Sequence, residues 1–421
     1  MRSDAASPRV GIFVREFPSP SETFIVSKVL GLLDAGIDVR IFAISPSPHW
    51  GRFAALAGRN DVRQRITYLL PLSPRTLLTR GLPRFMTVLV TRPIQVLRLV
   101  THSWRTRREN TLGFALAVYW RASLAGQTMD LLHIEFDIQA LGIADLRDYL
   151  RCRVLVSSRG AFQRSTVHRR FPHGFAYICR YADAFHFISE HLRLNAIRLG
   201  LPASMRTVLI EPAIDLRVFP VVGKRQPRAP DEPLRILSVG RLSWEKGYEY
   251  ALDAVALLVE RGLVLEYTIL GEGDYREAIV FAARQHGLLQ RGIVRLLGAV
   301  PREEVVDHYR HAHVLLHAVV DEGFCNSVLE AQAMQLPVVA SDAGGLPENL
   351  ADGITGFIVP RRDVRAMADR MWQLAHDPVL YEKLSAAGRE RVAERFELGR
   401  QIAGFVALYR ELSQYFIARQ Q

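Results

Sequence analysis

The chain has 421 residues, of which 49% are apolar and 23% are charged. This balance is typical of globular proteins and excludes collagen-like, fibrous and largely disordered chains, while the length predicts two or three domains of ~100–200 residues each. The formal net charge of +11 indicates acidic partners, but charge alone does not choose between the phosphates of a lipid, a nucleotide or RNA.

The first half of the chain alternates apolar runs with amphipathic stretches. Residues 9–14 predict a buried strand and residues 38–45 predict a second one. Between them, residues 21–36 have the apolar spacing of a helix, with Ser21 as its expected N-cap. This order predicts parallel strands joined by right-handed crossovers. Further strands are expected at residues 130–136, 152–158, 184–190 and 207–213. We therefore expect a Rossmann-like domain over residues 1–219.

Residues 62–108 form a basic segment that contains ten arginines and no acidic residue. Leucines, valines and Trp104 lie between the arginines. This mixture is typical of segments that lie in the headgroup layer of an anionic membrane, which is the interpretation we favour. Two alternatives are a helix pair that packs its leucines inward, and nucleic-acid binding, for which no recognised reader motif is present.

Cysteine usage and hydropathy bear on the compartment. Cys152, Cys179 and Cys325 are far apart and form no CxxC pair, which argues against a disulfide scaffold and a structural zinc site. No window of ~18 residues is free of charge, so no membrane span is expected. The apolar run near the N-terminus, about five residues long, is shorter than the ~7–15 of a signal peptide. We expect an intracellular protein.

A second α/β series follows residues 220–233, which are rich in proline and charge and which we interpret as an interdomain linker. Residues 234–399 are expected to form a second Rossmann-like domain. Its strands are expected at residues 234–240, 265–271, 293–298, 314–320, 337–341 and 356–360. Ligands of such sheets bind outside the carboxyl ends of the strands, so the chemistry is expected in the loops that follow them.

Two of these loops combine glycines with charge. Gly240 ends a strand, and Arg241 and Lys246 follow before a helix, so both cations can reach one diphosphate near the helix N-terminus. Gly271 and Gly273 follow the next strand and permit a ligand to approach the backbone closely. A solvated basic loop and a plain tight turn are the alternative interpretations.

The loop at residues 321–331 is the most informative. Glu322 lies in the loop and Glu330 in the helix that follows, so both carboxylates can face one ligand. The amides of Gly323 to Asn326 are donors at the helix N-terminus. The alternative is a capped helix with two surface glutamates. Residues 341–348 repeat the order of strand, glycine turn and helix.

Together these loops resemble the retaining GT-B glycosyltransferases of family 4. The family motif GRLxxEKG corresponds to residues 240–247, and its E-x7-E motif to Glu322 and Glu330. The resemblance is dense from about residue 235 to 360, and a weaker one over residues 9–45 is to bacterial polysaccharide-assembly members. It implies two Rossmann-like α/β domains, an inter-domain cleft and a C-terminal helix, about residues 400–421, that crosses back to complete the first domain.

The resemblance also implies a role for individual residues. Arg241 and Lys246 would bind the diphosphate of a nucleotide sugar, Glu330 its ribose, and Glu322 the hydroxyls of its sugar. Glu322, Arg241 and Lys246 are therefore the expected catalytic residues. Further donor contacts are expected from Gly240, Gly273, Leu297, Gly298, Ala299, Gly323, Phe324, Cys325 and Asn326. The resemblance also implies that no metal or other cofactor takes part, and the absence of a DxD motif at a strand end agrees with this.

The acceptor side departs from the family pattern. Many members carry a histidine in a turn of the first domain near the donor sugar, and the corresponding turn here, residues 157–161, has Arg159. Arg159 and His133 are the candidates for this polar role, and Ser21 is a further acceptor-side candidate. A core histidine with satisfied hydrogen bonds is the alternative for His133.

The resemblance thus implies a retaining, metal-independent hexosyltransferase of cell-surface glycan synthesis. Its donor would be a GDP- or UDP-sugar and its acceptor a polysaccharide or a lipid-linked oligosaccharide. The expected location is the cytoplasm, at the inner face of the plasma membrane through residues 62–108, without nucleic acid. The alternatives are a non-catalytic nucleotide-sugar-binding protein and a GT-B sugar-nucleotide epimerase.

Overall fold

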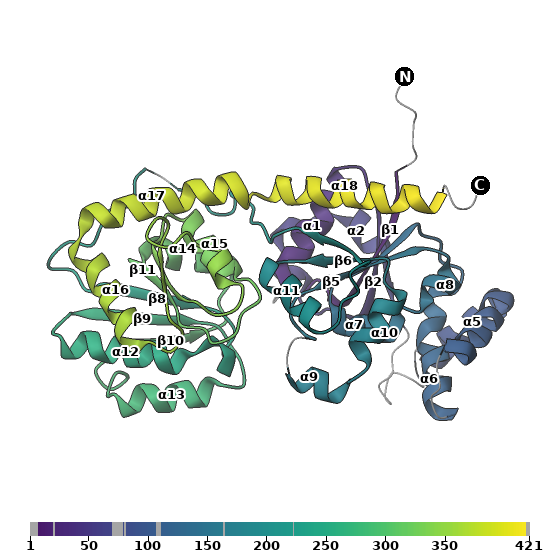
Figure 1. The fold of residues 1–421 in the computed structure, drawn as a ribbon, viewed down its shortest axis with the longest axis horizontal. Helices are drawn as coiled ribbons and strands as arrows, with labels where there is room; N and C mark the ends of the chain where they lie inside the picture. The colour runs from purple at the N-terminus through teal and green to yellow at the C-terminus, as the bar shows by residue number, and fades with distance from the viewer. Residues whose placement is uncertain are drawn as a thin grey trace, which may run out of the picture. The chain divides into compact units, whose positions relative to one another are not determined.

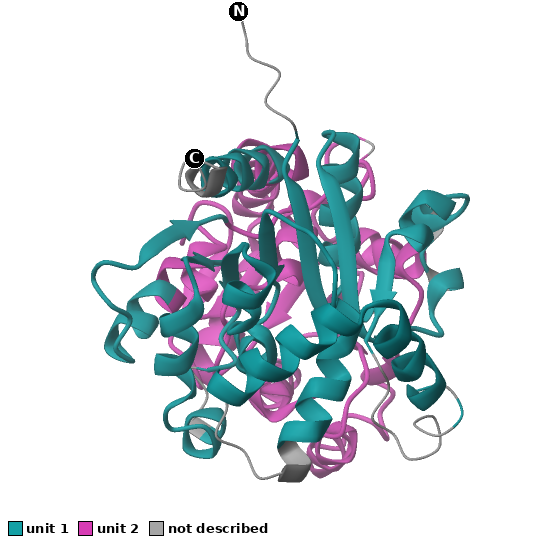
Figure 2. Ribbon diagram, turned by 90° about the vertical axis from the view of Figure 1, so that its right-hand side faces the viewer, with its two compact units in different colours: residues 1–188, 193–210, 402–421 teal, residues 189–192, 211–401 magenta. Residues whose placement is uncertain are grey.

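The computed structural model describes residues 7–19, 22–69, 79, 81–106, 111–162, 165–221 and 223–417. The chain forms two compact units, which Figure 2 distinguishes by colour. Unit 1 comprises residues 1–188, 193–210 and 402–421, and unit 2 comprises residues 189–192 and 211–401. Each unit contains one parallel sheet with helices on its faces (Figure 1), which confirms the predicted α/β class.

The sheet of unit 1 has seven strands in the order β3-β2-β1-β4-β5-β6-β7, and every neighbouring pair is parallel. The strands are β1 (Arg9–Phe17), β2 (Asp38–Pro46), β3 (Ile66–Tyr68), β4 (Leu131–Ile134), β5 (Arg153–Ser158), β6 (Ala184–Phe187) and β7 (Arg206–Leu209). In the central strand β1, Ile12 faces Ile41 on one side and His133 on the other. After β1, the chain first adds β2 and β3 on one side of it and then β4 to β7 on the other side. The topological switch point of the sheet therefore lies between β1 and β4.

The helices of this part of the chain connect and cover these strands. They are α1 (Thr23–Asp34), α2 (Asn60–Gln64), α4 (Leu82–Thr91), α5 (Pro93–Thr106), α6 (Thr111–Arg121), α7 (Asp137–Ile143), α8 (Leu146–Leu150), α9 (Ser165–Arg170), α10 (Gly174–Tyr181), α11 (Glu190–Arg198) and α18 (Leu398–Ile417). Helix α1 buries Ile25, Val29 and Leu32 at helical spacing. Its expected N-cap, Ser21, lies outside the described residues.

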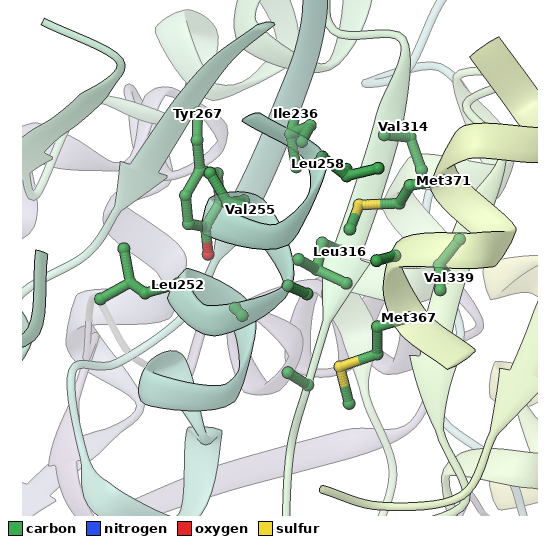
Figure 3. Packing of buried hydrophobic residues seen from close by; sticks show 14 of the residues in the cluster. Ile236, Leu252, Val255, Leu258, Tyr267, Val314, Leu316, Val339, Met367 and Met371 are labelled. Carbon is green, nitrogen blue, oxygen red and sulfur yellow. The ribbon is translucent and has the colours of Figure 1, made fainter. Parts of the chain in front are cut away.

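The sheet of unit 2 has six parallel strands in the order β10-β9-β8-β11-β12-β13. They are β8 (Leu234–Val239), β9 (Leu265–Leu270), β10 (Val294–Gly298), β11 (Val314–His317), β12 (Val338–Ser341) and β13 (Phe357–Val359). The helices are α12 (Tyr248–Glu260), α13 (Arg276–Gln285), α14 (Arg302–His311), α15 (Asn326–Ala333), α16 (Val364–His376) and α17 (Pro378–Arg395). Figure 3 shows the core, where Leu252 and Val255 of α12 and Met367 and Met371 of α16 gather around Leu316 of β11.

The observed division of the chain falls nearer the N-terminus than the predicted boundary after residue 219. Residues 211–219 belong to unit 2, because Ile214 donates its amide to the carbonyl of Phe396 at 2.9 Å and accepts from Leu398 at 3.0 Å. The proline-rich segment 220–233 is also part of unit 2. The guanidinium of Arg225 donates to the hydroxyl of Tyr381 at 3.0 Å, so this segment packs on a domain instead of spanning open solvent.

The C-terminal helix α18 completes unit 1 from residue 402 onward. Tyr409 is fully buried, and its hydroxyl lies 2.6 Å from Nδ1 of His133 on β4. The ammonium of Lys28 on α1 lies 3.8 Å from the ring centre of Phe405 and forms a buried ion pair with Glu135. These contacts tie the end of the chain to elements near its beginning.

The helices of the basic segment expose an apolar surface. Leu82, Met86, Leu89 and Val90 of α4 are exposed and follow helical spacing, so they share one face. Ile94, Leu97 and Trp104 of α5, and Leu116 of the helix α6 that follows, are also exposed. The alternative in which this segment packs its leucines inward therefore does not hold for α4.

Arg121, at the end of α6, is fully buried and fixes this helical region to the rest of unit 1. Its guanidinium donates to both carboxylate oxygens of Asp145, at 2.9 and 2.6 Å. Asp145 is also fully buried. Removing one member of such a pair leaves the other charge buried without its partner, which is the costly case.

We therefore expect Arg121→Ala to lower the free energy of unfolding by about 3–5 kcal/mol. Arg59→Ala is the matched control, because Arg59 pairs with Asp61 at the surface, where such pairs contribute little to stability. Urea unfolding followed by circular dichroism measures both changes. Equal, small losses in the two variants would show that the buried pair does not anchor this region.

Candidate functional site

The candidate site of unit 2 is built from loops that follow β8, β9, β11 and β12, at the carboxyl edge of the sheet. Backbone hydrogen bonds lock these loops together: Leu242 donates to Glu272 at 2.9 Å, and Val320 donates to Glu245 at 2.8 Å. Gly345 donates to the carbonyl of Glu322 at 2.8 Å. Because Val320 bonds to another loop, β11 ends at His317 and not at residue 320 as predicted.

Two glycines hold these loops at close approach. Gly271 has φ of +142°, and a Cβ there would overlap the carbonyl oxygen of Gly240. Gly344 has φ of +57°, and a Cβ there would overlap the carbonyl of Glu322. These glycines therefore allow the backbones of neighbouring loops to contact one another.

Lys246 and Glu322 form an ion pair between the β8 and β11 loops. Each side chain is 17% exposed, so the pair is largely shielded from water. Burial raises the pKa of Glu322, but Lys246 and a hydrogen bond with His317 more than offset this and lower it to about 2. The carboxylate is thus ionised at neutral pH. Despite burial, the pKa of Lys246 is raised by Glu322, so the ammonium is charged as well.

His317 and Cys325 extend this pair into a cluster that the sequence analysis missed. Nε2 of His317 lies 3.0 Å from Sγ of Cys325 and 3.8 Å from Oε2 of Glu322. The predicted role of Cys325 was a free amide, but that amide donates to Oδ1 of Asn349 at 3.2 Å. Nδ2 of Asn349 donates to the Cys325 carbonyl at 2.9 Å. In the sequence these residues form the pattern H-x4-E-x2-C, which spans a strand end, a loop and the start of a helix. This pattern could have indicated the cluster.

Glu330 lies on the same helix but in a different environment. Its Oε2 accepts a hydrogen bond of 3.0 Å from the hydroxyl of Tyr309, and burial raises its pKa. Tyr309 therefore fixes the orientation of this carboxylate. Tyr309 was not among the predicted site residues, because it lies in a helix far from the motifs.

The other predicted donor-site residues lie on or beside this edge. Arg241 is exposed directly after β8. In the part of the chain that the structure describes, the amides of Gly323 and Phe324 make no backbone hydrogen bond, so they are available donors. The remaining positions are Gly240, Gly273, Leu297, Gly298, Ala299 and Asn326, which lie at the ends of β8, β9 and β10 and at the start of α15.

The acceptor-side candidates of unit 1 have different outcomes. Ser21 lies outside the described residues. His133 is fully buried, with Nε2 2.7 Å from the hydroxyl of Ser157 and Nδ1 2.6 Å from that of Tyr409, as in the core-histidine alternative. Arg159 donates to Glu135 Oε2 at 3.0 Å and stacks on a phenylalanine ring.

Glu22 is a further candidate that the sequence analysis did not single out. Its Oε2 is buried and has no hydrogen-bond partner among the described residues. Burial raises the pKa of Glu22 to about 7, although the positive charge of Arg159 opposes the shift. A carboxyl group with these properties, close to a cation, is a candidate for binding a hydroxyl group.

Comparison with known proteins relates this arrangement to sugar transfer. Residues 223–391 match the family described as glycosyl transferases group 1. The amylovoran biosynthesis glycosyltransferase AmsK of Erwinia amylovora is 26% identical over 401 residues, covering 92% of this chain and 96% of AmsK. WcaL of Escherichia coli (strain K12), named as a proposed colanic acid biosynthesis glycosyltransferase, is 26% identical over 380 residues, covering 86% of this chain and 89% of WcaL.

Among solved structures, Anabaena Alr3699/HepE in complex with UDP-glucose has a similar fold. Its TM-score is 0.67 at 14% identity, and the match covers 95% of this chain and 99% of HepE. At this identity the likeness concerns the fold, and it agrees with the two parallel α/β units described above.

The contact between the β8 and β9 loops yields a prediction. Gly271→Ala should destabilise unit 2 by about 2 kcal/mol or more, because backbone strain at such a residue costs ~1–3 kcal/mol and the Gly240 carbonyl must also move. Gly262→Ala is the control: Gly262 also has positive φ, +87°, but nothing lies within 4 Å of a Cβ there. Urea unfolding should show the larger loss for Gly271→Ala, and equal losses would contradict the packing argument.

Proposed function

We propose that this chain, a glycosyltransferase with the GT-B fold whose residues 223–391 match the glycosyl transferases group 1 family, uses a GDP- or UDP-sugar as its donor. The proposed acceptor is a polysaccharide or a lipid-linked oligosaccharide. The proposed reaction retains the anomeric configuration and requires no metal. The names of AmsK and WcaL, which match most of this chain, support a role in exopolysaccharide biosynthesis.

The observation that carries this proposal is the Lys246–Glu322 pair at the carboxyl edge of the sheet. A fixed ammonium, the exposed Arg241 and the unbonded amides of Gly323 and Phe324 present donors and positive charge at one edge. This combination suits the diphosphate group of a nucleotide sugar. The UDP-glucose complex of the structurally similar HepE supports a nucleotide sugar as the ligand.

In the proposed mechanism, Arg241 and Lys246 stabilise the leaving diphosphate. Glycosyl transfer passes through an oxocarbenium-like transition state, and negative charge grows on the leaving phosphate oxygen. Fixed cations and amides aimed at that oxygen stabilise the transition state more than the ground state. That phosphate oxygen then accepts the proton of the acceptor hydroxyl, so no separate general base is needed.

Glu322 and Glu330 orient the two ends of the donor in this mechanism. Glu322, kept ionised by Lys246, accepts hydrogen bonds from sugar hydroxyls. Glu330, held by Tyr309, accepts from the ribose. Neither carboxylate acts as a nucleophile.

Two other functions remain as alternatives for the same site. A non-catalytic nucleotide-sugar-binding protein would bind the donor without releasing nucleoside diphosphate. A sugar-nucleotide epimerase would convert the donor without an acceptor. Release of nucleoside diphosphate that depends on added acceptor separates the proposed transferase from both.

The exposed apolar face of α4 and α5 supports contact with an anionic membrane, where a lipid-linked acceptor would lie. Val90 and Leu97 are 75% and 63% exposed, and Arg84, Arg98 and Arg105 on the same two helices are exposed too. Each arginine near an anionic leaflet contributes about 1 kcal/mol. None of the helices within the described residues is long and apolar enough to cross a membrane.

We expect Lys246→Ala to reduce kcat by ~10²-fold or more, the scale of losing one transition-state donor. Glu322→Ala should reduce kcat to a similar extent, because Lys246 and the sugar hydroxyls lose the carboxylate that positions them. Arg295→Ala, a change at an exposed ion pair of the same unit, should leave kcat within about twofold. Initial rates of nucleoside diphosphate release, with saturating donor and added acceptor, measure kcat for each variant. Circular dichroism checks folding, and near-normal kcat in both folded site variants would refute the assignment.

For membrane contact, we expect the chain to float with vesicles that contain anionic lipid and to dissociate at high salt. The double variant Val90→Asp, Leu97→Asp should reduce the bound fraction at least tenfold, since it places charge in the apolar contact. Val379→Asp, a change at a 78% exposed valine of unit 2, should have no effect. Equal flotation of all three proteins would rule out this surface.

A further inference from the structure

We propose that His317, Glu322 and Cys325 form a binding site for Zn²⁺, and that zinc bound there excludes the nucleotide sugar. The zinc site stands on the cluster alone, whereas the exclusion rests on the proposed function of Glu322 and Lys246. Zinc would act here as an inhibitor and not as a cofactor of transfer.

The geometry of the three ligand atoms suits a zinc ion. Nε2 of His317, Oε2 of Glu322 and Sγ of Cys325 all lie within 4.8 Å of one another. Nε2 is 3.0 Å from Sγ and 3.8 Å from Oε2. Tetrahedral zinc with bonds of ~2.0–2.3 Å separates such atoms by ~3.3–3.6 Å. The two measured separations therefore lie within about half an ångström of these values, and the third does not exceed 4.8 Å.

The chemistry of the cluster also suits zinc. Imidazole nitrogen, carboxylate oxygen and thiolate sulfur are the three ligand types that zinc takes in proteins. Three protein ligands leave a fourth position open for water or an anion. Among the described residues, this is the group of three such side chains close enough to share one ion. Since the ligand is a thiolate, binding releases the proton of Cys325.

The cluster is held by the fold before any ion arrives. His317 ends the central strand β11, and Cys325 immediately precedes α15. Both residues are 4% exposed. The side-chain amide of Asn349 holds the backbone of Cys325 on both its N–H and its carbonyl. A site on rigid elements loses little conformational entropy when it binds.

Zinc and the donor compete because they need the same carboxylate. Oxygen Oε2 of Glu322, the proposed ligand, also contacts the ammonium of Lys246. A dication on this oxygen repels Lys246 and removes Glu322 from the sugar hydroxyls. Zinc should therefore weaken donor binding, and by linkage the donor should weaken zinc binding by the same factor.

The first test measures zinc binding to the full chain with no donor present, by competition with a chromophoric zinc chelator. We expect Cys325→Ser and His317→Ala to weaken zinc binding by ~10–100-fold or more, since even supporting residues of metal sites have effects of this size. Cys179→Ser, a change at a partly exposed free cysteine of unit 1, should bind zinc like the wild type. Cobalt offers a second readout, because a thiolate ligand gives an intense near-ultraviolet band that Cys325→Ser should abolish.

Circular dichroism establishes that each variant is folded, and Cys325→Ser is the decisive one because it changes a single atom. Equal zinc affinity and equal cobalt spectra in wild type and Cys325→Ser would overturn the zinc site, whatever the enzyme does with its donor. The zinc site is supported if Cys325→Ser loses both the zinc affinity and the cobalt band while Cys179→Ser keeps them.

The second test titrates a UDP-sugar and a GDP-sugar calorimetrically, with and without saturating zinc. A rise of at least tenfold in the apparent Kd of the nucleotide sugar that binds, absent in Cys325→Ser, supports exclusion. Unchanged nucleotide-sugar affinity in a protein that holds zinc overturns exclusion alone. If neither nucleotide sugar binds the zinc-free wild type, the proposed donor site fails while the zinc measurement stands.

Discussion

The ion pair between Lys246 and Glu322 is the interaction on which the site of unit 2 depends. Two charges largely removed from water lose hydration energy that offsets much of their attraction, so such a pair is weak evidence for stability. It is better understood as a device for function. The ammonium is held in place before any ligand binds, and the carboxylate stays ionised because the ammonium is beside it. Preorganised charge of this kind needs little reorganisation during reaction.

The pair can exist only because the loops that carry it are interlocked. Val320 donates to Glu245 and Gly345 donates to Glu322, so the segments that follow β8, β11 and β12 form one structure. Glycine is required where a Cβ would overlap a neighbouring carbonyl, as at Gly271 and Gly344. In unit 1, buried polar groups have a different use: His133 hydrogen-bonds to the hydroxyl of Tyr409, and the ammonium of Lys28 lies over the ring of Phe405. Both contacts hold α18 in the domain.

Much of this arrangement was predictable from the sequence, and the limits have physical causes. The strands were predictable because fully buried parallel strands are short apolar runs, and the loops because parallel strands end at a common edge. The partners of individual side chains were not. His133 meets Tyr409 across 276 positions, and no local pattern encodes such a contact. Tyr309 and Asn349 were missed for the same reason. Residues 211–219 were predicted to belong to the first domain, because the hydrogen bond between Ile214 and Phe396 also joins distant parts of the chain and leaves no local pattern.

The cationic edge of unit 2 is expected to bind the diphosphate of a nucleotide. The most direct measurement is calorimetric titration of UDP and GDP into the zinc-free wild-type chain and into folded Lys246→Ala. One of the two nucleotides should bind the wild type, and Lys246→Ala should weaken this binding at least tenfold. Equal affinity in both proteins, or no binding of either nucleotide to the wild type, would contradict the proposed diphosphate site.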